Sequence, residues 1–134
     1  MKTETFKTII EQVDYLLFDM KHWDSQRHKE GTGIYNELIL SNMKYAVQAG
    51  KIILPRIPVI PGYNDSIEDA VQFANLLKKT GITTCQLLPF HQFGENKYDL
   101  LIRTYVYKAQ PSLHKEDLTE YQTAFLDNGV DAYF

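Results

Sequence analysis

Residues 54–65 read LPRIPVIPGYND, an apolar run that contains one arginine and stops at a Pro-Gly pair. An apolar run that ends at Pro-Gly is typical of a buried strand entering a loop. Two other runs follow the same plan, YLLFDMK at residues 15–21 and QLLPFH at residues 86–91. Each run delivers polar side chains at or near its end, so we expect polar groups to recur where strands stop.

The polar side chains delivered in this way are Asp19, Lys21, Arg56 and His91. In α/β architectures built from parallel strands, the carboxyl ends of the strands form one rim, and ligands bind at that rim. We therefore expect the four side chains to converge there and to surround one small molecule.

Length and composition limit the class of protein. The chain has 134 residues, of which 44% are hydrophobic, and this suits one domain with a buried core. A net charge of -3 with both signs interspersed predicts neither a nucleic-acid partner nor a membrane partner. The apolar runs are too short to span a bilayer and the first residues do not form a signal peptide, so we expect a cytoplasmic protein.

The single cysteine, Cys85, lies inside the third strand run. One cysteine excludes an internal disulfide and cannot by itself hold an iron–sulfur cluster or a structural zinc ion. We therefore expect a buried thiol at this position and no metal site in this chain.

Helix and strand patterns alternate along the chain. Apolar spacings of three and four predict helices at residues 3–13, about 38–50, 66–81 and about 115–128. Apolar runs predict strands at residues 15–20, 52–59, 83–88 and 130–134. Residues 22–35 have the composition of a polar loop, and residues 89–111 form a second long loop. This alternation predicts right-handed crossovers and a parallel sheet.

A Rossmann-like sheet and part of a (β/α) barrel both fit this order of elements. The sequence contains no Gly-x-Gly-x-x-Gly turn, which argues against the dinucleotide-binding fold. A complete eight-stranded barrel takes about 250 residues, so four strands amount to about half of one. We expect a partial barrel whose first strand has an unpaired flank.

The residues at the predicted rim have both structural and functional interpretations. Asp19 and Lys21 can pair with each other or bind a zwitterionic ligand, because side chains two apart on a strand share one face. Arg56 needs a partner such as Asp19 or an anionic ligand group. His91 can bind or stack on a ligand ring, although a loop histidine is often ordinary surface. Residues 64–65 are expected to make a turn, and either Asp65 or Ser66 is expected to cap the next helix, because Glu68 and Asp69 lie at capping-box distance.

Several motifs, taken in order and spacing, resemble one known family. They are LFDMK at residues 17–21, His28 with TG at 32–33, Asn42, RIPVIPGYND at 56–65, and LLPFHQFG at 87–94 with KY at 97–98. Together they resemble the carboxyl-terminal half of the glycyl-radical enzyme activating enzymes, the pyruvate formate-lyase activating enzyme-like members of the radical S-adenosylmethionine superfamily. The resemblance extends from about residue 8 to about residue 100.

The resemblance implies a partial (β/α) barrel with a [4Fe-4S] cluster on a Cys-x-x-x-Cys-x-x-Cys loop near its amino end. This sequence has neither that loop nor the Gly-Gly-Glu segment that binds the methionine amino group in relatives. Both are expected upstream of Met1. Residues 1–134 are therefore interpreted as the carboxyl-terminal part of the domain, inactive by itself without the cluster cysteines.

The resemblance also implies roles for individual residues. Asp19, Met20 and Lys21 match the Asp-x-Lys strand end that lies against the ribose and methionyl portions of S-adenosylmethionine. Arg56 matches a strand arginine that faces the same cofactor, and His91 matches a histidine near its adenosyl end. A carboxylate, two cations and an imidazole suit a zwitterionic ligand with a cationic sulfur and an aromatic base. No catalytic residue and no metal ligand is assigned to this chain.

The implied chemistry belongs to anaerobic metabolism. The cluster cleaves the sulfonium reductively, and the resulting 5′-deoxyadenosyl radical removes hydrogen from a glycine of a pyruvate formate-lyase-like partner. The implied electron donor is a reductant of the flavodoxin or ferredoxin type. Aromatic residues in the loop at 89–111 are candidates to receive the partner's glycine loop.

Two other interpretations of the sequence remain open. The chain could be a truncated, non-catalytic binding partner that completes its sheet against another subunit. It could also be a lyase that uses Lys21 as a Schiff-base amine. The second alternative needs a neutral amine, and the neighbouring Asp19 should favour the charged form.

Overall fold

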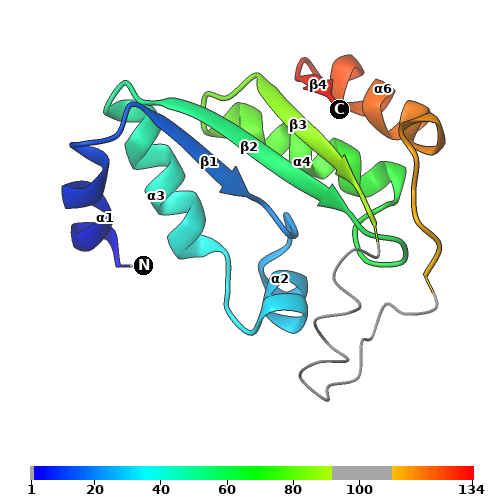
Figure 1. The fold of residues 1–134 in the computed structure, drawn as a ribbon, viewed down its shortest axis with the longest axis horizontal. Coiled ribbons are helices and arrows are strands. Elements are labelled where there is room, and N and C mark those ends of the chain that lie inside the picture. Colours follow the sequence, from blue (N-terminus) through cyan, green and yellow to red (C-terminus); the bar gives the residue numbers. More distant parts are fainter. Residues whose placement is uncertain (1, 92–109) are drawn as a thin grey trace.

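The computed structural model describes residues 2–91 and 110–134, and in these residues four parallel strands form one sheet in the order β1-β2-β3-β4. The strands are β1 (Tyr15–Asp19), β2 (Ile52–Val59), β3 (Thr84–Pro89) and β4 (Asp131–Tyr133). The helices are α1 (Thr3–Ile10), α2 (Ser25–Thr32), α3 (Glu37–Gln48), α4 (Ile67–Lys79), the 3-10 helix η1 (Lys115–Leu118) and α6 (Thr119–Asp127). Figure 1 shows their arrangement. Most of the predicted aromatic loop at 89–111 lies outside the described residues.

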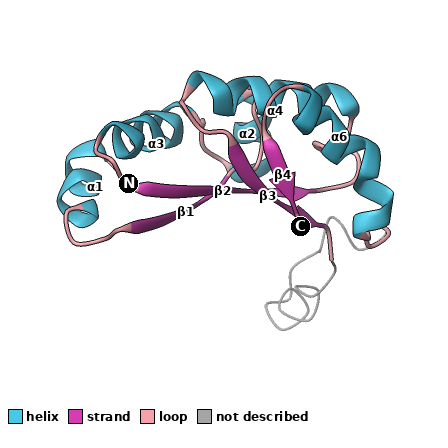
Figure 2. Cartoon of the chain, turned by 90° about the horizontal axis from the view of Figure 1, so that it is seen from above, coloured by secondary structure: helices cyan, strands magenta, loops and turns pink. Residues whose placement is uncertain are grey.

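Among the described residues, the helices lie on one side of the sheet and no helix covers its other face (Figure 2). Consecutive strands are also neighbours in the sheet. A doubly wound Rossmann sheet instead carries helices on both faces and reverses its strand order, whereas a (β/α) barrel adds strands in sequence and keeps its helices outside. The predicted α/β class, with about four parallel strands in a partial (β/α) barrel, is confirmed.

The two faces of the sheet follow from the alternation of side chains along each strand. In β2, Pro55, Ile57 and Val59 are buried under the helices, while Arg56 points to the open face and is only half-buried. The three prolines at positions 55, 58 and 61 predict an irregular strand end. β2 nevertheless keeps its register with β3 up to its last residue, Val59, so the prediction is wrong for the strand itself.

Two clusters of apolar side chains attach the helices to the sheet. The smaller cluster joins Phe6 and Ile10 of α1 to Ala46 of α3. The larger one lies between α4, α6 and the strands, and it includes the fully buried Phe73 and Phe125. Among the described residues, no helix has the length and apolar character needed to cross a membrane.

The prediction of a polar loop at residues 22–35 is wrong, because α2 forms within it. Asp24 caps this helix by accepting a hydrogen bond from the backbone N–H of Arg27 at 2.8 Å. Gly33 ends it with a φ of 83°, a left-handed conformation that glycine adopts readily. The sequence SQRHKEGT has no apolar stripe, and His28 is its buried residue. Figure 1 shows α2 beyond the carboxyl end of β1.

Candidate functional site

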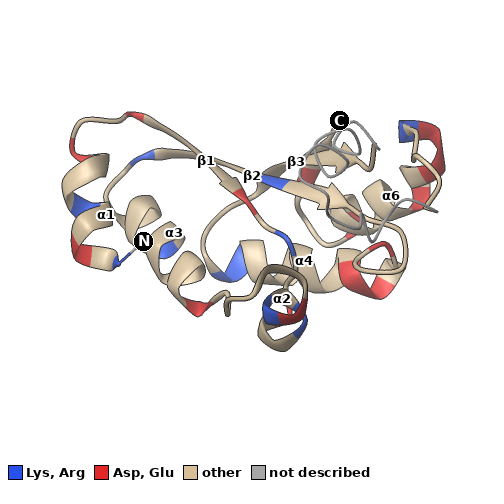
Figure 3. Cartoon of the chain, turned by 60° about the horizontal axis from the view of Figure 1, so that its bottom comes forward, with Lys and Arg blue, Asp and Glu red and all other residues tan. Residues whose placement is uncertain are grey.

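Strand register aligns three polar side chains across the open face of the sheet. Asp19 of β1 is the register partner of Arg56 in β2, which is in turn the partner of Gln86 in β3. Figure 3 shows the acidic position of β1 beside the basic position of β2. Sequence reasoning did not single out Gln86, although the alternation of polar and apolar residues from Thr84 to Leu87 was a signal that it faces away from the core.

Asp19 holds two cations with one carboxylate. Its Oδ1 lies 2.7 Å from Nη2 and 2.8 Å from Nε of Arg56, and its Oδ2 lies 3.4 Å from Nζ of Lys21. The side chains of Asp19 and Lys21 are each 38% exposed and that of Arg56 is 34% exposed. The cluster carries one net positive charge on an accessible face, so an anionic group can approach it without displacing the core.

Of the five residues predicted to bind the cofactor, three are in mutual contact on the open face, one lies after the neighbouring strand and one has a buried side chain. Asp19, Lys21 and Arg56 are in contact with one another. His91 is exposed and lies two residues beyond β3, after the neighbouring strand at the same edge of the sheet. The side chain of Met20 is buried in the core, only 3% exposed, and its backbone N–H donates to the carbonyl of Arg56 at 2.8 Å. If Met20 contacts a ligand on the open face, it would therefore do so through its main-chain atoms.

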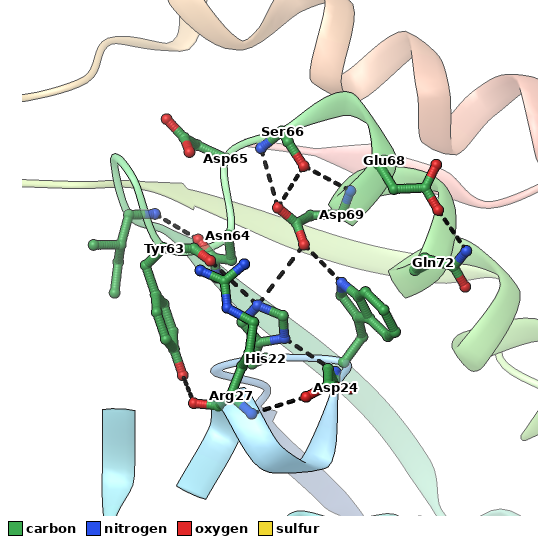
Figure 4. A network of polar contacts seen from close by, with 12 residues as sticks. His22, Asp24, Arg27, Tyr63, Asn64, Asp65, Ser66, Glu68, Asp69 and Gln72 are labelled. Atoms are coloured by element: carbon green, nitrogen blue, oxygen red, sulfur yellow. Dashed lines mark hydrogen bonds and ion pairs between the residues drawn. The ribbon is translucent and has the colours of Figure 1, made fainter. Parts of the chain in front are cut away.

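A polar network joins the segment after β1 to the turn after β2 and the start of α4 (Figure 4). The Nδ1 atom of His22 accepts the backbone N–H of Asp24 at 3.0 Å, which leaves the proton of the neutral ring on Nε2. That Nε2–H donates to the carbonyl of Tyr63 at 3.2 Å. Burial lowers the pKa of His22, and the carboxylate of Asp69, 3.7 Å from Nε2, opposes this shift. The ring is therefore a neutral link between two loops.

Asp69 connects the same network to the start of α4. Its Oδ1 accepts from Nε1 of Trp23 at 2.7 Å, and its Oδ2 accepts from the backbone N–H of Ser66 at 3.2 Å and from the Ser66 hydroxyl at 2.5 Å. Ser66 in turn caps α4, accepting from the backbone N–H of Asp69 at 3.1 Å. The predicted turn at residues 64–65 is present, since Asp65 accepts from the N–H of Gly62, and of the two predicted caps the structure has Ser66.

Asn64 has a role that sequence reasoning missed. It is fully buried, and its side chain contacts the segment after β1 as well as its own loop. Asn in a Pro-Gly-x-Asn sequence is a common turn residue, so composition gave no signal for this long-range contact.

The prediction of a buried thiol is confirmed for Cys85, and burial raises the pKa of this thiol to about 12. Within residues 2–91 and 110–134, no group of three or more His, Cys, Asp or Glu side chains is placed to hold a metal ion. With one cysteine in the whole sequence, this chain lacks the three thiolates of the cluster loop. The donor set does fit S-adenosylmethionine, whose carboxylate, ammonium and hydroxyl groups match cations and a carboxylate.

A parallel sheet with helices on one face and a charged cluster on the other places the chain in the class of partial (β/α) barrels. No protein-family model matches it. The chain is 38% identical over 136 residues to the 4-hydroxyphenylacetate decarboxylase activating enzyme of Clostridioides difficile, a match that covers 99% of this chain and 43% of the relative. It is 35% identical over 105 residues to the pyruvate formate-lyase 2-activating enzyme of Escherichia coli, covering 78% of this chain and 36% of the relative.

The choline trimethylamine-lyase activating enzyme of Oleidesulfovibrio alaskensis is 36% identical over 121 residues, 87% of this chain and 39% of the relative. The crystal structure of a domain of a pyruvate-formate lyase-activating enzyme from Bacteroides vulgatus has the same fold, with a TM-score of 0.75 and 24% identity over 98% of this chain and 73% of that one. The chain is thus homologous to the glycyl-radical enzyme activating enzymes, as its motifs predict. It spans less than half the length of these curated relatives.

Proposed function

We propose that residues 1–134 form the carboxyl-terminal, cofactor-facing part of an activating enzyme that acts on a glycyl-radical enzyme. S-adenosylmethionine and a [4Fe-4S] cluster supply the radical chemistry of such an enzyme when bound, and the cluster ligands come from outside this chain. The open face of the sheet would bind the sulfonium cofactor. The glycyl-radical partner, a flavodoxin-type or ferredoxin-type reductant and a cytoplasmic location remain predictions.

The observation that carries this proposal is the shared carboxylate of Asp19 on an accessible face. An ion pair exposed to this degree contributes only about 0–1 kcal/mol to stability, so stability alone does not explain why two cations are gathered there. Lys21 and Arg56 would bind the carboxylate of the cofactor, and Asp19 would accept hydrogen bonds from its ammonium or ribose hydroxyl groups. His91 would lie near the adenine end.

A Schiff-base role for Lys21 has less support. Its ammonium lies 3.4 Å from the carboxylate of Asp19, and the side chain is 38% exposed. A Schiff-base lysine is usually held neutral in a desolvated pocket or beside another cation.

The test separates binding from stability. S-adenosylmethionine affinity is measured by calorimetry on the longest form of the protein that its gene encodes, with Asp19→Asn and Lys21→Gln as variants. The matched control is Lys7→Gln, because Lys7 on α1 makes a similar exposed pair with Glu4 at 3.0 Å. We expect the two site variants to lose at least about tenfold in affinity while the free energy of unfolding changes by less than about 1 kcal/mol. No loss of affinity in either, or no binding by the unmodified protein, would overturn the proposal.

A second candidate function is that of a partner chain that docks through its open sheet face. Large apolar side chains are exposed on this face, with Tyr15 53%, Leu17 52% and Ile52 61% exposed. Exposed apolar patches of this kind often mark interaction surfaces. Light scattering on the chain of residues 1–134 tests this candidate, and a well-folded monomer would count against it.

A further inference from the structure

The side chain of Asn64 uses all of its hydrogen-bonding groups on the main chain of two strand ends. Its Nδ2 group donates to the carbonyl of Lys21 and to the carbonyl of Pro58, both at 2.9 Å. Its Oδ1 accepts the backbone N–H of Ile60 at 2.7 Å. The side chain is fully buried, so water cannot replace these bonds without a change in packing. Asn64 therefore links the segment that follows β1 to the end of β2.

Only a primary amide satisfies this arrangement. An aspartate at position 64 would place a carboxylate oxygen against two carbonyl oxygens, and it has no hydrogen to donate when ionised. Alanine would leave two buried carbonyls and one buried N–H without these partners, which is costly. These three contacts therefore require an asparagine at position 64, whereas a surface turn alone would accept several other residue types.

The main chain of Asn64 is itself bound by helix α6. Its carbonyl accepts a hydrogen bond at 2.9 Å from the hydroxyl of Tyr121 on α6, and both groups are buried. A parallel link joins the next pair of residues, since the Nε2 atom of His22 donates to the carbonyl of Tyr63. The segment after β1 is thus linked at Lys21 and His22 to the turn after β2, which is anchored to α6, while Asn36 holds the same segment one step further on through the carbonyls of His22 and Trp23.

Lys21 depends on these links more than its neighbours do. Asp19 and Arg56 are register partners within the sheet, so backbone pairing of β1 with β2 positions both. Lys21 lies two residues beyond the end of β1 and has no register partner in β2, and the last backbone bond before it runs from the Met20 N–H to the carbonyl of Arg56. Its carbonyl is bound by Asn64, while its ammonium lies 3.4 Å from Asp19.

We infer that Asn64 is a positioning residue, which holds the main chain of Lys21 so that its ammonium stays beside Asp19 on the open face. The inference rests on the proposed function, in which this ammonium binds S-adenosylmethionine. Asn64 does not touch the ligand, and it acts through Lys21. The two cations of the site are therefore held by different means, Arg56 by the sheet and Lys21 by a buried amide.

The first test uses the ligand-free protein in the longest form that the gene encodes. Competitive acetylation followed by mass spectrometry gives the labelling rate of Lys21 relative to that of Lys7. The control, Tyr121→Phe, removes a buried hydrogen bond to the same asparagine but keeps its amide contacts. We expect Asn64→Asp to change the Lys21 to Lys7 ratio at least about threefold and Tyr121→Phe to leave it unchanged. An unchanged ratio in Asn64→Asp would overturn the inference.

The second test is a double-mutant cycle on S-adenosylmethionine affinity. We expect Asn64→Asp to weaken binding about tenfold in the unmodified protein and to have almost no effect when Lys21 is already glutamine. Equal effects in both backgrounds would mean a general structural defect and would refute the role through Lys21. If Asn64→Asp does not fold, Asn64→Ala takes its place in both tests. A loss of affinity in Lys21→Gln without any effect of the Asn64 variants would overturn this inference and leave the proposed function intact.

Discussion

Replacing Gly31 by alanine should destabilise the chain, although the same change usually stabilises a helix. Gly31 lies within α2, and a Cβ atom added there would be 2.5 Å from Oη and 2.7 Å from Cζ of Tyr63. That ring is not free to move away. Its hydroxyl donates to the carbonyl of Arg27 at 2.9 Å, and its centroid lies 5.0 Å from that of the buried His22 ring.

The expected magnitude follows from three contributions. Alanine in place of glycine in a helix interior contributes about 0.5–1 kcal/mol of stability. Overpacking against a held side chain costs about 1–3 kcal/mol, and losing the hydroxyl hydrogen bond of Tyr63 costs about 1 kcal/mol. The net expectation is a free energy of unfolding lower by about 1–3 kcal/mol, measured by urea denaturation with the midpoint and the slope both fitted.

The same substitution in a Tyr63→Ala background provides the control. Without the ring the steric conflict disappears, so Gly31→Ala should then stabilise by up to about 1 kcal/mol. The sign of the effect should therefore reverse between the two backgrounds. If Gly31→Ala stabilises the unmodified chain, or costs the same in both backgrounds, the packing of α2 against the turn at residues 60–65 does not constrain this helix as described.

Two further predictions concern the polar network that joins the segment after β1 to the turn after β2. Burial lowers the pKa of His22, so this side chain binds fewer protons in the folded chain than in the unfolded chain. The contribution of neutral His22 to the free energy of unfolding is therefore complete above about pH 6.5 and declines as the pH falls below that value. Urea unfolding between pH 7.5 and 5 should show a shallower decline in His22→Gln, and parallel curves for the two proteins would contradict this. Asp69→Ala should lower the free energy of unfolding by about 2–4 kcal/mol, because it removes the carboxylate that accepts from the Ser66 backbone N–H in the capping box of α4 and from Trp23 Nε1. Glu68→Ala, which loses an exposed bond to Gln72, should cost less than about 0.5 kcal/mol, and equal costs would refute the assignment.

The sequence predicts the strands of this fold well for a physical reason. Parallel strands covered by helices need apolar side chains, and mostly apolar runs such as those at residues 52–59 and 84–89 are local features of the sequence. The contact of Asp19 with Arg56 could also be foreseen, because an arginine inside an apolar strand needs an anionic partner and Asp19 ends the neighbouring strand. The burial of the Met20 side chain could likewise be predicted from the sequence, since successive side chains along a strand point to opposite faces and Asp19 lies on the open face.

Features held by long-range polar contacts were not foreseen. The helix α2 has almost no apolar residues, so its pattern resembles a loop, and only the cap residues Asp24 and Gly33 indicated it. Asn64 reaches Lys21 across 43 positions of sequence, and Tyr121 reaches Asn64 across 57. No local periodicity encodes such pairs, because they depend on which loops meet after the sheet has formed.

Arg56 and Lys21 should respond differently to substitutions in the loops, because they are held by different contacts. Arg56 is aligned with Asp19 by backbone hydrogen bonds between β1 and β2, so a substitution in a loop leaves that pair in register. Lys21 has no such ladder and depends on a buried amide and on the loop that carries it. Damage to the turn at residues 60–65 should therefore separate the two cations, with Lys21 lost from the carboxylate first. If Asn64 positions Lys21 as inferred, the charged cluster needs the turn after β2 as well as an intact sheet, because the sheet aligns Arg56 with Asp19 and the turn binds the main chain of Lys21.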